Sequence, residues 1–142
     1  MTTILGSCVS VCLFDPIQAI GGMNHYIFPD NPDTKTATLR HGPFAIETLL
    51  DEMMRLGVVP FNLRAKVFGG GGTLTSLDCG IQVGRRNVNV ALEELKRQKI
   101  QISSKRVLGS SGVMIKMLTS TGDVWLRKIK NELDHPASAD HR

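Results

Sequence analysis

The sequence predicts an α+β fold, a layered sandwich in which a mixed or antiparallel sheet packs against two main helices. Strand-like segments outnumber helix-like segments, and the two kinds follow one another in a mixed order rather than in regular alternation. A length of 142 residues, with 42% hydrophobic and 21% charged content, suits one globular domain with a sizeable core. We therefore expect a single domain over residues 1–130 and a frayed polar tail over residues 131–142.

The first expected element is a hairpin. Residues 9–14 read VSVCLF, with an aliphatic residue at every second position, as in a half-buried strand. Asp15 and Pro16 suit the first two positions of a type I turn, and the chain then resumes an extended run over residues 20–28. Two antiparallel strands joined by a tight turn are therefore predicted.

A loop and a helix come next. Residues 29–41 carry two prolines and no periodicity, which is typical of a surface loop or lid. Pro43 opens a helix because proline fits the first turn, and Gly57 supplies a left-handed stop. The apolar residues between them recur at the spacing of a core-facing stripe, with Met53 and Met54 as core filler.

The second half of the chain predicts one more helix among short strands. Residues 63–68 form a strand that runs into four consecutive glycines, and Asn87 is expected to cap the second helix. In that helix Val88, Leu92 and Leu95 face the core. The remaining strands are expected at residues 100–104, 113–118 and 124–129, with Thr121-Gly122-Asp123 as the turn between the last two.

Composition excludes several classes of protein. The longest uncharged run, residues 1–14, is too short and too interrupted by Gly and Ser for a membrane span, and it lacks the basic start of a secretion signal. Three cysteines, an odd number, argue against a disulfide framework and favour a reducing compartment, so we expect a cytoplasmic protein. A net charge of +4 is spread thinly over a chain with 5% aromatic residues, which argues against nucleic acid as the main ligand.

The expected hairpin brings a thiol and an imidazole together. With the turn centred after Pro16, Cys8 lies opposite His25, and opposed residues project to the same face with Cβ atoms about 5 Å apart. An imidazole beside a thiol favours the thiolate, and this pair is the basic unit of nucleophilic catalysis by cysteine. Gly6 and Ser7 permit a tight backbone whose amides can point at a developing oxyanion.

Other interpretations of these residues stay open. A lone cysteine such as Cys8 can be a small buried hydrophobic residue, and Cys12 is interpreted as core filler. Cys8, Cys12, His25 and His41 form a possible zinc set, but four strand residues span about 13 Å, too far for the two sulfurs to share a metal or form a disulfide. The glycine run lacks the lysine of a phosphate-binding loop, so it forms either a flexible turn or a close approach of backbone to the Cys8 pocket.

Several motifs then appear in a recognisable order. The amino-terminal ones are Thr2, Leu5-Gly6-Ser7-Cys8-Val9-Ser10-Val11-Cys12, Asp15-Pro16, Gly21-Gly22-Met23-Asn24-His25 and Phe28-Pro29-Asp30. The later ones are Lys66-Val67-Phe68-Gly69-Gly70, Val83-Gly84-Arg85-Arg86-Asn87-Val88, and Thr121-Gly122 with Val124. Over nearly the whole chain they resemble the CheD family, the chemoreceptor glutamine deamidases of bacterial and archaeal chemotaxis. The separation of 17 residues between Cys8 and His25 is the specific signal.

The resemblance implies a cysteine-dependent protein-glutamine glutaminase with a fold similar to toxin-type cysteine deamidases. The expected site residues are Cys8 as nucleophile, His25 as base and Thr2 as the group orienting the imidazole, with Gly6, Ser7, Gly69 and Gly70 at the oxyanion or substrate. The implied substrate is a receptor glutamine on a cytoplasmic helix, which becomes glutamate with release of ammonia. Receptor methyl-ester hydrolysis and binding of a CheC-type phosphatase are also implied, whereas no metal or cofactor is.

Two alternatives differ in what the site does. A non-catalytic adaptor of the same fold, binding a CheC-type phosphatase, is motivated by the altered late motif Arg106-Val107-Leu108-Gly109. Removal of Met1 would make Thr2 the amino terminus, and a terminal threonine can itself be a nucleophile. Because Thr2 directly follows Met1, we expect it to lie on a fraying segment.

Overall fold

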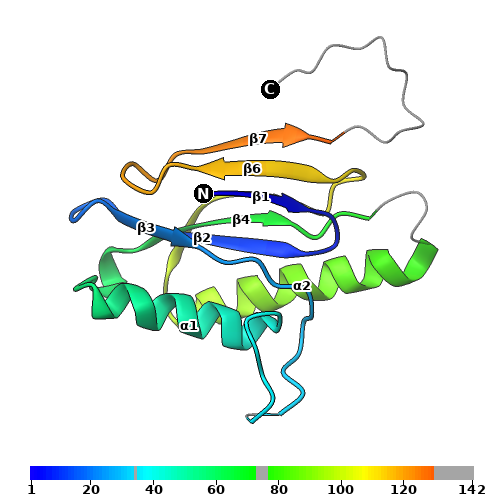
Figure 1. Ribbon diagram of the computed structural model, residues 1–142, viewed down its shortest axis with the longest axis horizontal. Helices are drawn as coiled ribbons and strands as arrows, with labels where there is room; N and C mark the ends of the chain where they lie inside the picture. The colour runs from blue at the N-terminus through cyan, green and yellow to red at the C-terminus, as the bar shows by residue number, and fades with distance from the viewer. Residues whose placement is uncertain (34, 73–76, 130–142) are drawn as a thin grey trace.

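The computed structural model describes residues 1–33, 35–72 and 77–129, with residues 77–79 as backbone only. Its elements form three layers, which are a pair of helices, a four-stranded sheet and a three-stranded sheet (Figure 1). This arrangement confirms the predicted α+β sandwich. The tail that was predicted to fray lies outside the described residues. Within the described residues, neither helix combines the length and the hydropathy that crossing a membrane requires.

The larger sheet is the middle layer and has the strand order β3-β2-β4-β5. Its strands are β2 (Val9–Asp15), β3 (Ile20–Met23), β4 (Arg64–Gly69) and β5 (Gln101–Val107). β4 and β5 run parallel, whereas the other neighbours are antiparallel. The smaller sheet is antiparallel throughout, with the order β1-β6-β7. Its strands are β1 (Thr2–Leu5), β6 (Val113–Met117) and β7 (Val124–Lys128).

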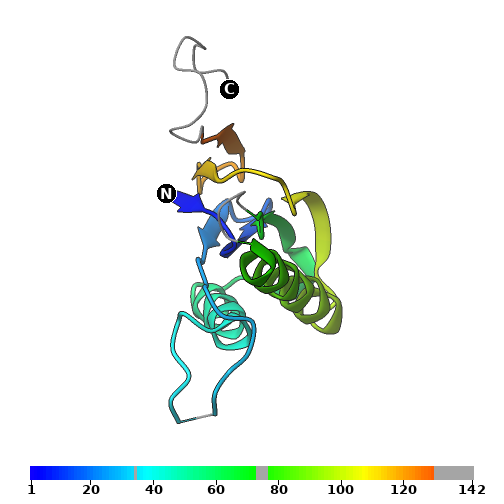
Figure 2. The ribbon, with the colours of Figure 1, turned by 90° about the vertical axis from the view of Figure 1, so that its right-hand side faces the viewer.

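Both helices cover the outer face of the larger sheet, where they lie side by side (Figure 2). They are α1 (Gly42–Arg55) and α2 (Leu77–Arg97), and a 3-10 helix, η1 (Pro60–Asn62), lies between α1 and β4. Pro43 stands in the first turn of α1, and Gly57 follows its end with φ of +95°, both as predicted. Met53 is buried as expected, but Met54 is 47% exposed, because the next residue along a helix turns about 100° away from the core-facing stripe.

The strand β2 lies at the centre of the core and is covered on both faces. Val9, Val11 and Leu13 belong to the main hydrophobic cluster, which β2 shares with the helices. Cys12 and Phe14 point the other way and pack in a second cluster against the smaller sheet. The prediction of a half-buried strand is therefore wrong, because a second sheet covers the face that was expected to meet solvent.

The hairpin of β2 and β3 forms as predicted, but its register is shifted. Cys12 pairs with Met23, whereas the predicted register pairs it with Gly21. A four-residue turn, residues 16–19, replaces the expected two-residue turn, because the Asp15 carboxylate accepts hydrogen bonds from backbone N–H groups inside it. A shift of two residues leaves every side chain on its predicted face.

The helix α2 begins at Leu77, so Asn87 lies in the middle of the helix and does not cap it. Gly84 also lies inside α2, where the chain at Gly70 packs directly against it. A Cβ atom at Gly84 would lie 2.4 Å from the carbonyl oxygen of Gly70. Val88 and Leu95 face the core as predicted.

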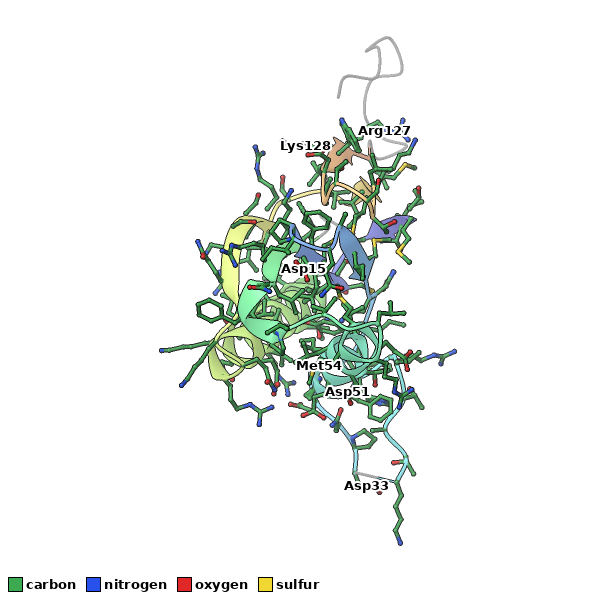
Figure 3. All side chains as sticks on the ribbon, turned by 90° about the vertical axis from the view of Figure 1, so that its left-hand side faces the viewer. Asp15, Asp33, Asp51, Met54, Arg127 and Lys128 are labelled. Atoms are coloured by element: carbon green, nitrogen blue, oxygen red, sulfur yellow. The ribbon has the colours of Figure 1, made fainter. Side chains whose placement is uncertain are left out.

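The segment from residue 24 to residue 41 connects β3 to α1. Its base is held by isolated pairings of Tyr26 with Val9 and of Phe28 with His41. Figure 3 places Asp33 at the tip of this segment, at the opposite end of the molecule from Arg127 and Lys128 on β7. The described part of residues 29–41 is mostly exposed, which agrees with the predicted surface loop.

Candidate active site

Cys8 and His25 come from the two arms of the hairpin, just before β2 and just after β3. Val9 and Tyr26 exchange two backbone hydrogen bonds, of 3.1 and 2.9 Å, which places Cys8 opposite Ile27 and diagonal to His25. Diagonal neighbours on one face of a hairpin lie roughly 7 Å apart. The predicted direct opposition is therefore wrong, but both side chains keep their shared face.

That shared face is turned toward the smaller sheet. The half-buried Cys8 packs against the second hydrophobic cluster, which contains Leu5 of β1. The exposed His25 makes a hydrogen bond of 2.7 Å between its Nδ1 and Oγ1 of Thr3, which is also on β1. Because Thr3 and Leu5 lie two residues apart in a strand, they project to the same face. The strand β1 therefore covers the thiol and the imidazole together.

The residue that shares a hydrogen bond with His25 is Thr3 and not Thr2, the residue that the resemblance indicates. Adjacent strand residues point to opposite faces, and Thr2 shares the exposed face of β1 with Ile4. Thr2 also pairs with Lys116 of β6, so it lies in a strand rather than on the fraying segment that was expected. The sequence motif could not show which of two neighbouring threonines faces the imidazole, and Thr3 was missed for that reason.

Three successive carbonyl groups anchor the chain at Cys8. Gly71 N–H donates to Gly6 O at 2.9 Å, Asn87 Nδ2 donates to Ser7 O at 2.9 Å, and Gly70 N–H donates to Cys8 O at 2.8 Å. In a planar trans peptide the C=O and the N–H point in opposite directions. The N–H groups of Ser7 and Cys8 are therefore directed away from these anchors, as an oxyanion-binding backbone requires.

Gly69, the last residue of β4, and Gly70, which follows it, bring their backbone against Cys8, which confirms the close-approach interpretation. Gly69 has φ of +105°, and a Cβ atom there would lie 2.2 Å from the carbonyl oxygen of Cys8. The N–H of Gly70 is taken by that same carbonyl, so Gly70 supports the backbone at Cys8 and is not free to bind an oxyanion. A Cβ atom at Gly6 would meet nothing within 4 Å, which leaves open space beside the thiol's loop.

The local environment keeps both candidate groups uncharged near neutral pH. Burial raises the pKa of the Cys8 thiol above its ordinary value of 9.0, and a hydrogen bond from its own backbone N–H only partly opposes this. Desolvation lowers the pKa of His25 below its ordinary value of 6.5. A neutral imidazole on the same face as a neutral thiol can act as its general base.

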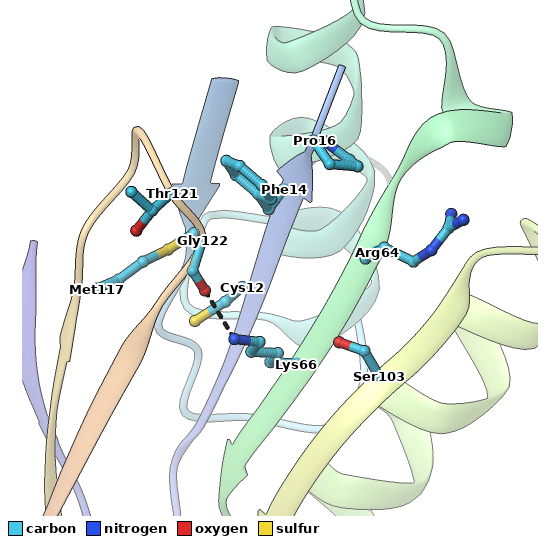
Figure 4. A pocket seen from close by; sticks show the side chains of 9 residues that line it. All are labelled: Cys12, Phe14, Pro16, Arg64, Lys66, Ser103, Met117, Thr121 and Gly122. Carbon is cyan, nitrogen blue, oxygen red and sulfur yellow. Dashed lines mark hydrogen bonds between the residues drawn. The ribbon is translucent and has the colours of Figure 1, made fainter. Parts of the chain in front are cut away.

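Cys12 lies away from this pair and is confirmed as core filler. It is 2% exposed, and burial raises its pKa to about 11. It borders a small cavity of about 170 Å³ that Phe14 and Lys66 also line (Figure 4). The Lys66 ammonium donates to the carbonyl oxygen of Gly122 at 2.8 Å, and both residues line that cavity.

Comparisons with known proteins show which family this chain resembles. The family model described as CheD chemotactic sensory transduction matches residues 27–128. A probable chemoreceptor glutamine deamidase CheD of Rhodospirillum rubrum is 41% identical over 94% of this chain and 75% of its own length. A protein of Shewanella oneidensis with the same description, CheD 1, is 39% identical over 92% of this chain and 65% of its own length.

A third relative, a probable chemoreceptor glutamine deamidase CheD of Bordetella avium, is 37% identical over 91% of this chain. The match spans 58% of that protein, so this chain corresponds to somewhat more than half of its relative's length. The family model covers well over half of the present chain, and the relatives match more than nine tenths of it. The chain therefore belongs to the CheD family.

Proposed function

We propose that this chain is a chemoreceptor glutamine deamidase that uses Cys8 as its nucleophile. The observation that carries the proposal is the placement of Cys8 and His25 on one face of the hairpin, with β1 over both. The names of the relatives supply the substrate class, a glutamine side chain of a chemoreceptor. Cysteine attack on a carboxamide is a chemistry that such a pair can perform.

The first half of the reaction forms a thioester. His25 removes the proton of Cys8 as the sulfur adds to the carboxamide carbon of the substrate glutamine. The tautomer that this step requires donates Nδ1–H to Oγ1 of Thr3 and leaves Nε2 as the basic nitrogen, and the contact with Thr3 fixes the plane of the ring. The imidazolium then gives its proton to the leaving nitrogen, and ammonia departs as the C–N bond breaks.

The negative oxygen formed during attack needs donors nearby. The N–H groups of Ser7 and Cys8 are the best candidates, because the carbonyls of their peptides are anchored on the opposite side. One such donor typically contributes a factor of about 10² to 10³ in rate. Gly6 leaves space for the substrate side chain to enter beside them.

The second half of the reaction hydrolyses the thioester. His25, neutral again, takes a proton from water as the water oxygen adds to the thioester carbon. The C–S bond breaks, the Cys8 thiol is restored, and the receptor side chain leaves as glutamate. The same sequence of steps would release methanol from a glutamyl methyl ester, because only the leaving group differs.

The proposal also concerns location and partners. A substrate helix on the cytoplasmic side of a chemoreceptor requires the enzyme to act in the cytoplasm. A CheC-type phosphatase is proposed as a second partner, and nucleic acid is not.

The test is a comparison of two cysteine variants. The protein is incubated with cytoplasmic fragments of chemoreceptors, and conversion of glutamine to glutamate is mapped by peptide mass spectrometry. We expect conversion by the wild type and by Cys12→Ala, and none by Cys8→Ala. Conversion that persists in Cys8→Ala rejects the assigned nucleophile. No conversion by any of the three proteins favours the adaptor alternative.

A further inference from the structure

Asn87 occupies an unusual position for an amide side chain. It lies in the interior of α2 and is 0% exposed. Asparagine is a poor helix former away from the caps, and a buried amide destabilises a fold unless it is hydrogen bonded. Its presence there therefore needs partners that compensate for both costs.

Those partners are backbone carbonyls on either side of the site. Nδ2 of Asn87 donates to the carbonyl oxygen of Ser7 at 2.9 Å and to that of Ile27 at 2.8 Å. Ser7 directly precedes the nucleophile Cys8, and Ile27 follows His25 by two residues. One amide group on the helix therefore ties the segment of the nucleophile to the segment of the base.

The hydrogen bond to Ser7 also fixes the direction of the Cys8 N–H. The carbonyl of Ser7 and the N–H of Cys8 belong to one planar peptide, so holding the oxygen aims the hydrogen the opposite way. That N–H lowers the pKa of the Cys8 thiol, against the larger effect of burial, and so favours the thiolate. The amide of Asn87 thus sets the direction of a donor that serves both the thiolate and the developing oxyanion.

Of the three groups that hold the carbonyls of residues 6–8, only Asn87 uses its side chain, so only this contact can be removed by a substitution. The carbonyls of Gly6 and Cys8 are held by backbone N–H groups, which no substitution removes cleanly. The oxygen of the same amide, Oδ1, is buried and has no hydrogen-bond partner within the described residues. The side chain is therefore oriented by its two donated bonds alone.

We infer that Asn87 is a positioning residue for Cys8, which aims the Cys8 N–H and keeps the segments of Cys8 and His25 together. The inference rests on the proposed function. It differs from a general role in stability, because the hydrogen bonds of Asn87 end on the peptides beside the reacting groups. Its removal should therefore change the reactivity of the thiol as well as the fold.

Tyr26 provides a matched control. Its hydroxyl donates to the backbone carbonyl of Asn87 at 2.5 Å, and its side chain is also fully buried. Tyr26→Phe removes one buried hydrogen bond at the same residue of α2 without touching the carbonyl of Ser7. A purely structural effect should therefore appear in both variants, and a positioning effect only at Asn87.

The experiment compares Asn87→Leu, Asn87→Ser and Tyr26→Phe with the wild type. Deamidation kinetics give kcat and KM, and alkylation of Cys8 by iodoacetamide as a function of pH reports the thiolate directly. We expect Asn87→Leu to lower kcat by about tenfold to a hundredfold with little change in KM, in keeping with a misdirected oxyanion donor. The midpoint of alkylation should move to higher pH, whereas Tyr26→Phe should change neither quantity.

Asn87→Ser keeps the test valid if the leucine variant does not fold, because a serine hydroxyl can donate to only one of the two carbonyls. It should give an intermediate loss of kcat. Folded Asn87 variants with the kcat and alkylation midpoint of Tyr26→Phe would overturn the inference. A wild type that does not deamidate, with a shifted alkylation midpoint in the Asn87 variants, would instead reject the proposed function and leave the positioning of Cys8 supported.

Discussion

Oγ1 of Thr3 lies 2.7 Å from Nδ1 of His25, which joins the first strand of the smaller sheet to the hairpin of the larger one. This contact crosses the space between the two sheets at the place where Cys8 is half-buried. It leaves one ring nitrogen of His25 for the thiol. The pairing of β1 with β6 is therefore part of what orients the candidate base.

Thr3→Val should reduce kcat by roughly tenfold or more, because the imidazole loses the contact that fixes its plane and tautomer. Thr2→Val is the matched control, since it changes the same residue type on the exposed face of β1 and should leave kcat near the wild-type value. Steady-state kinetics with a receptor fragment measure both. A larger loss in Thr2→Val than in Thr3→Val would show that Thr2, and not Thr3, orients the base.

The dependence of kcat/KM on pH should have its acidic midpoint below 6.5, the ordinary pKa of histidine. Desolvation lowers the pKa of His25, so the neutral form that accepts the proton persists to a lower pH than for a free imidazole. Activity is expected to fall only as the pH drops through that lowered value. A midpoint above 6.5 in the pH–rate profile would contradict a desolvated neutral base.

Substitution of Cys8 should remove activity, whereas substitution of Cys12 should lower stability. Cys12→Ala removes a buried sulfur from the cluster between the sheets and should lower the free energy of unfolding by about 1 kcal/mol, with kcat retained. Cys8→Ala should unfold near the wild-type midpoint but lose deamidation. Denaturant unfolding and an activity assay on the same samples measure the pair. Loss of activity in a well-folded Cys12→Ala would argue that the second thiol takes part.

Gly69→Ala should destabilise the protein by about 2 kcal/mol or more, because the residue has a positive φ and its Cβ would collide with the carbonyl oxygen of Cys8. Gly6→Ala serves as the control, since a Cβ atom there meets open space and should cost far less. Equal unfolding midpoints for the two variants would mean that the chain does not make the close approach described.

The parts of this fold that carry a local signal could be predicted from the sequence. Pro43 lies in the first turn of α1 and Gly57 follows its end. Gly122, with φ of +79°, lies in the turn between β6 and β7.

The start of α2 was predicted at Asn87 because asparagine is a preferred cap residue, but the helix begins at Leu77. Within the part that was missed, Gly84 packs directly against Gly70. Its requirement for glycine comes from a tertiary contact that no local pattern contains.

Strand pairing between distant segments was the other source of error. The residues Thr2–Leu5 are too few to indicate a strand by themselves, and they form β1 by pairing with β6, more than a hundred residues away. β5 extends to Val107 over exposed polar residues, because its parallel pairing with β4 and not a hydrophobic pattern sets its length. Pairings of this kind depend on the whole topology.

The residues of the candidate site also fall into two groups, those that a local pattern could predict and those that depend on tertiary contacts. The shared face of Cys8 and His25 was predictable because a single hairpin carries both residues, and even a register error of two residues preserved that face. Thr3 and Asn87 were not, because their contacts with His25 and Ser7 join separate elements of the fold. The sequence predicts Asn87 as a helix cap, whereas in the structure its side chain donates hydrogen bonds to the carbonyls of Ser7 and Ile27.

The most direct measurement of the central claim is capture of the covalent intermediate. The protein is mixed with a receptor fragment, quenched in acid within the first turnover, digested and mapped by mass spectrometry. We predict a receptor glutamyl thioester on the peptide that contains Cys8, and none in His25→Ala, where the proton acceptor is missing. Rapid conversion of glutamine to glutamate with no adduct on Cys8, or with the adduct on another residue, would contradict the account.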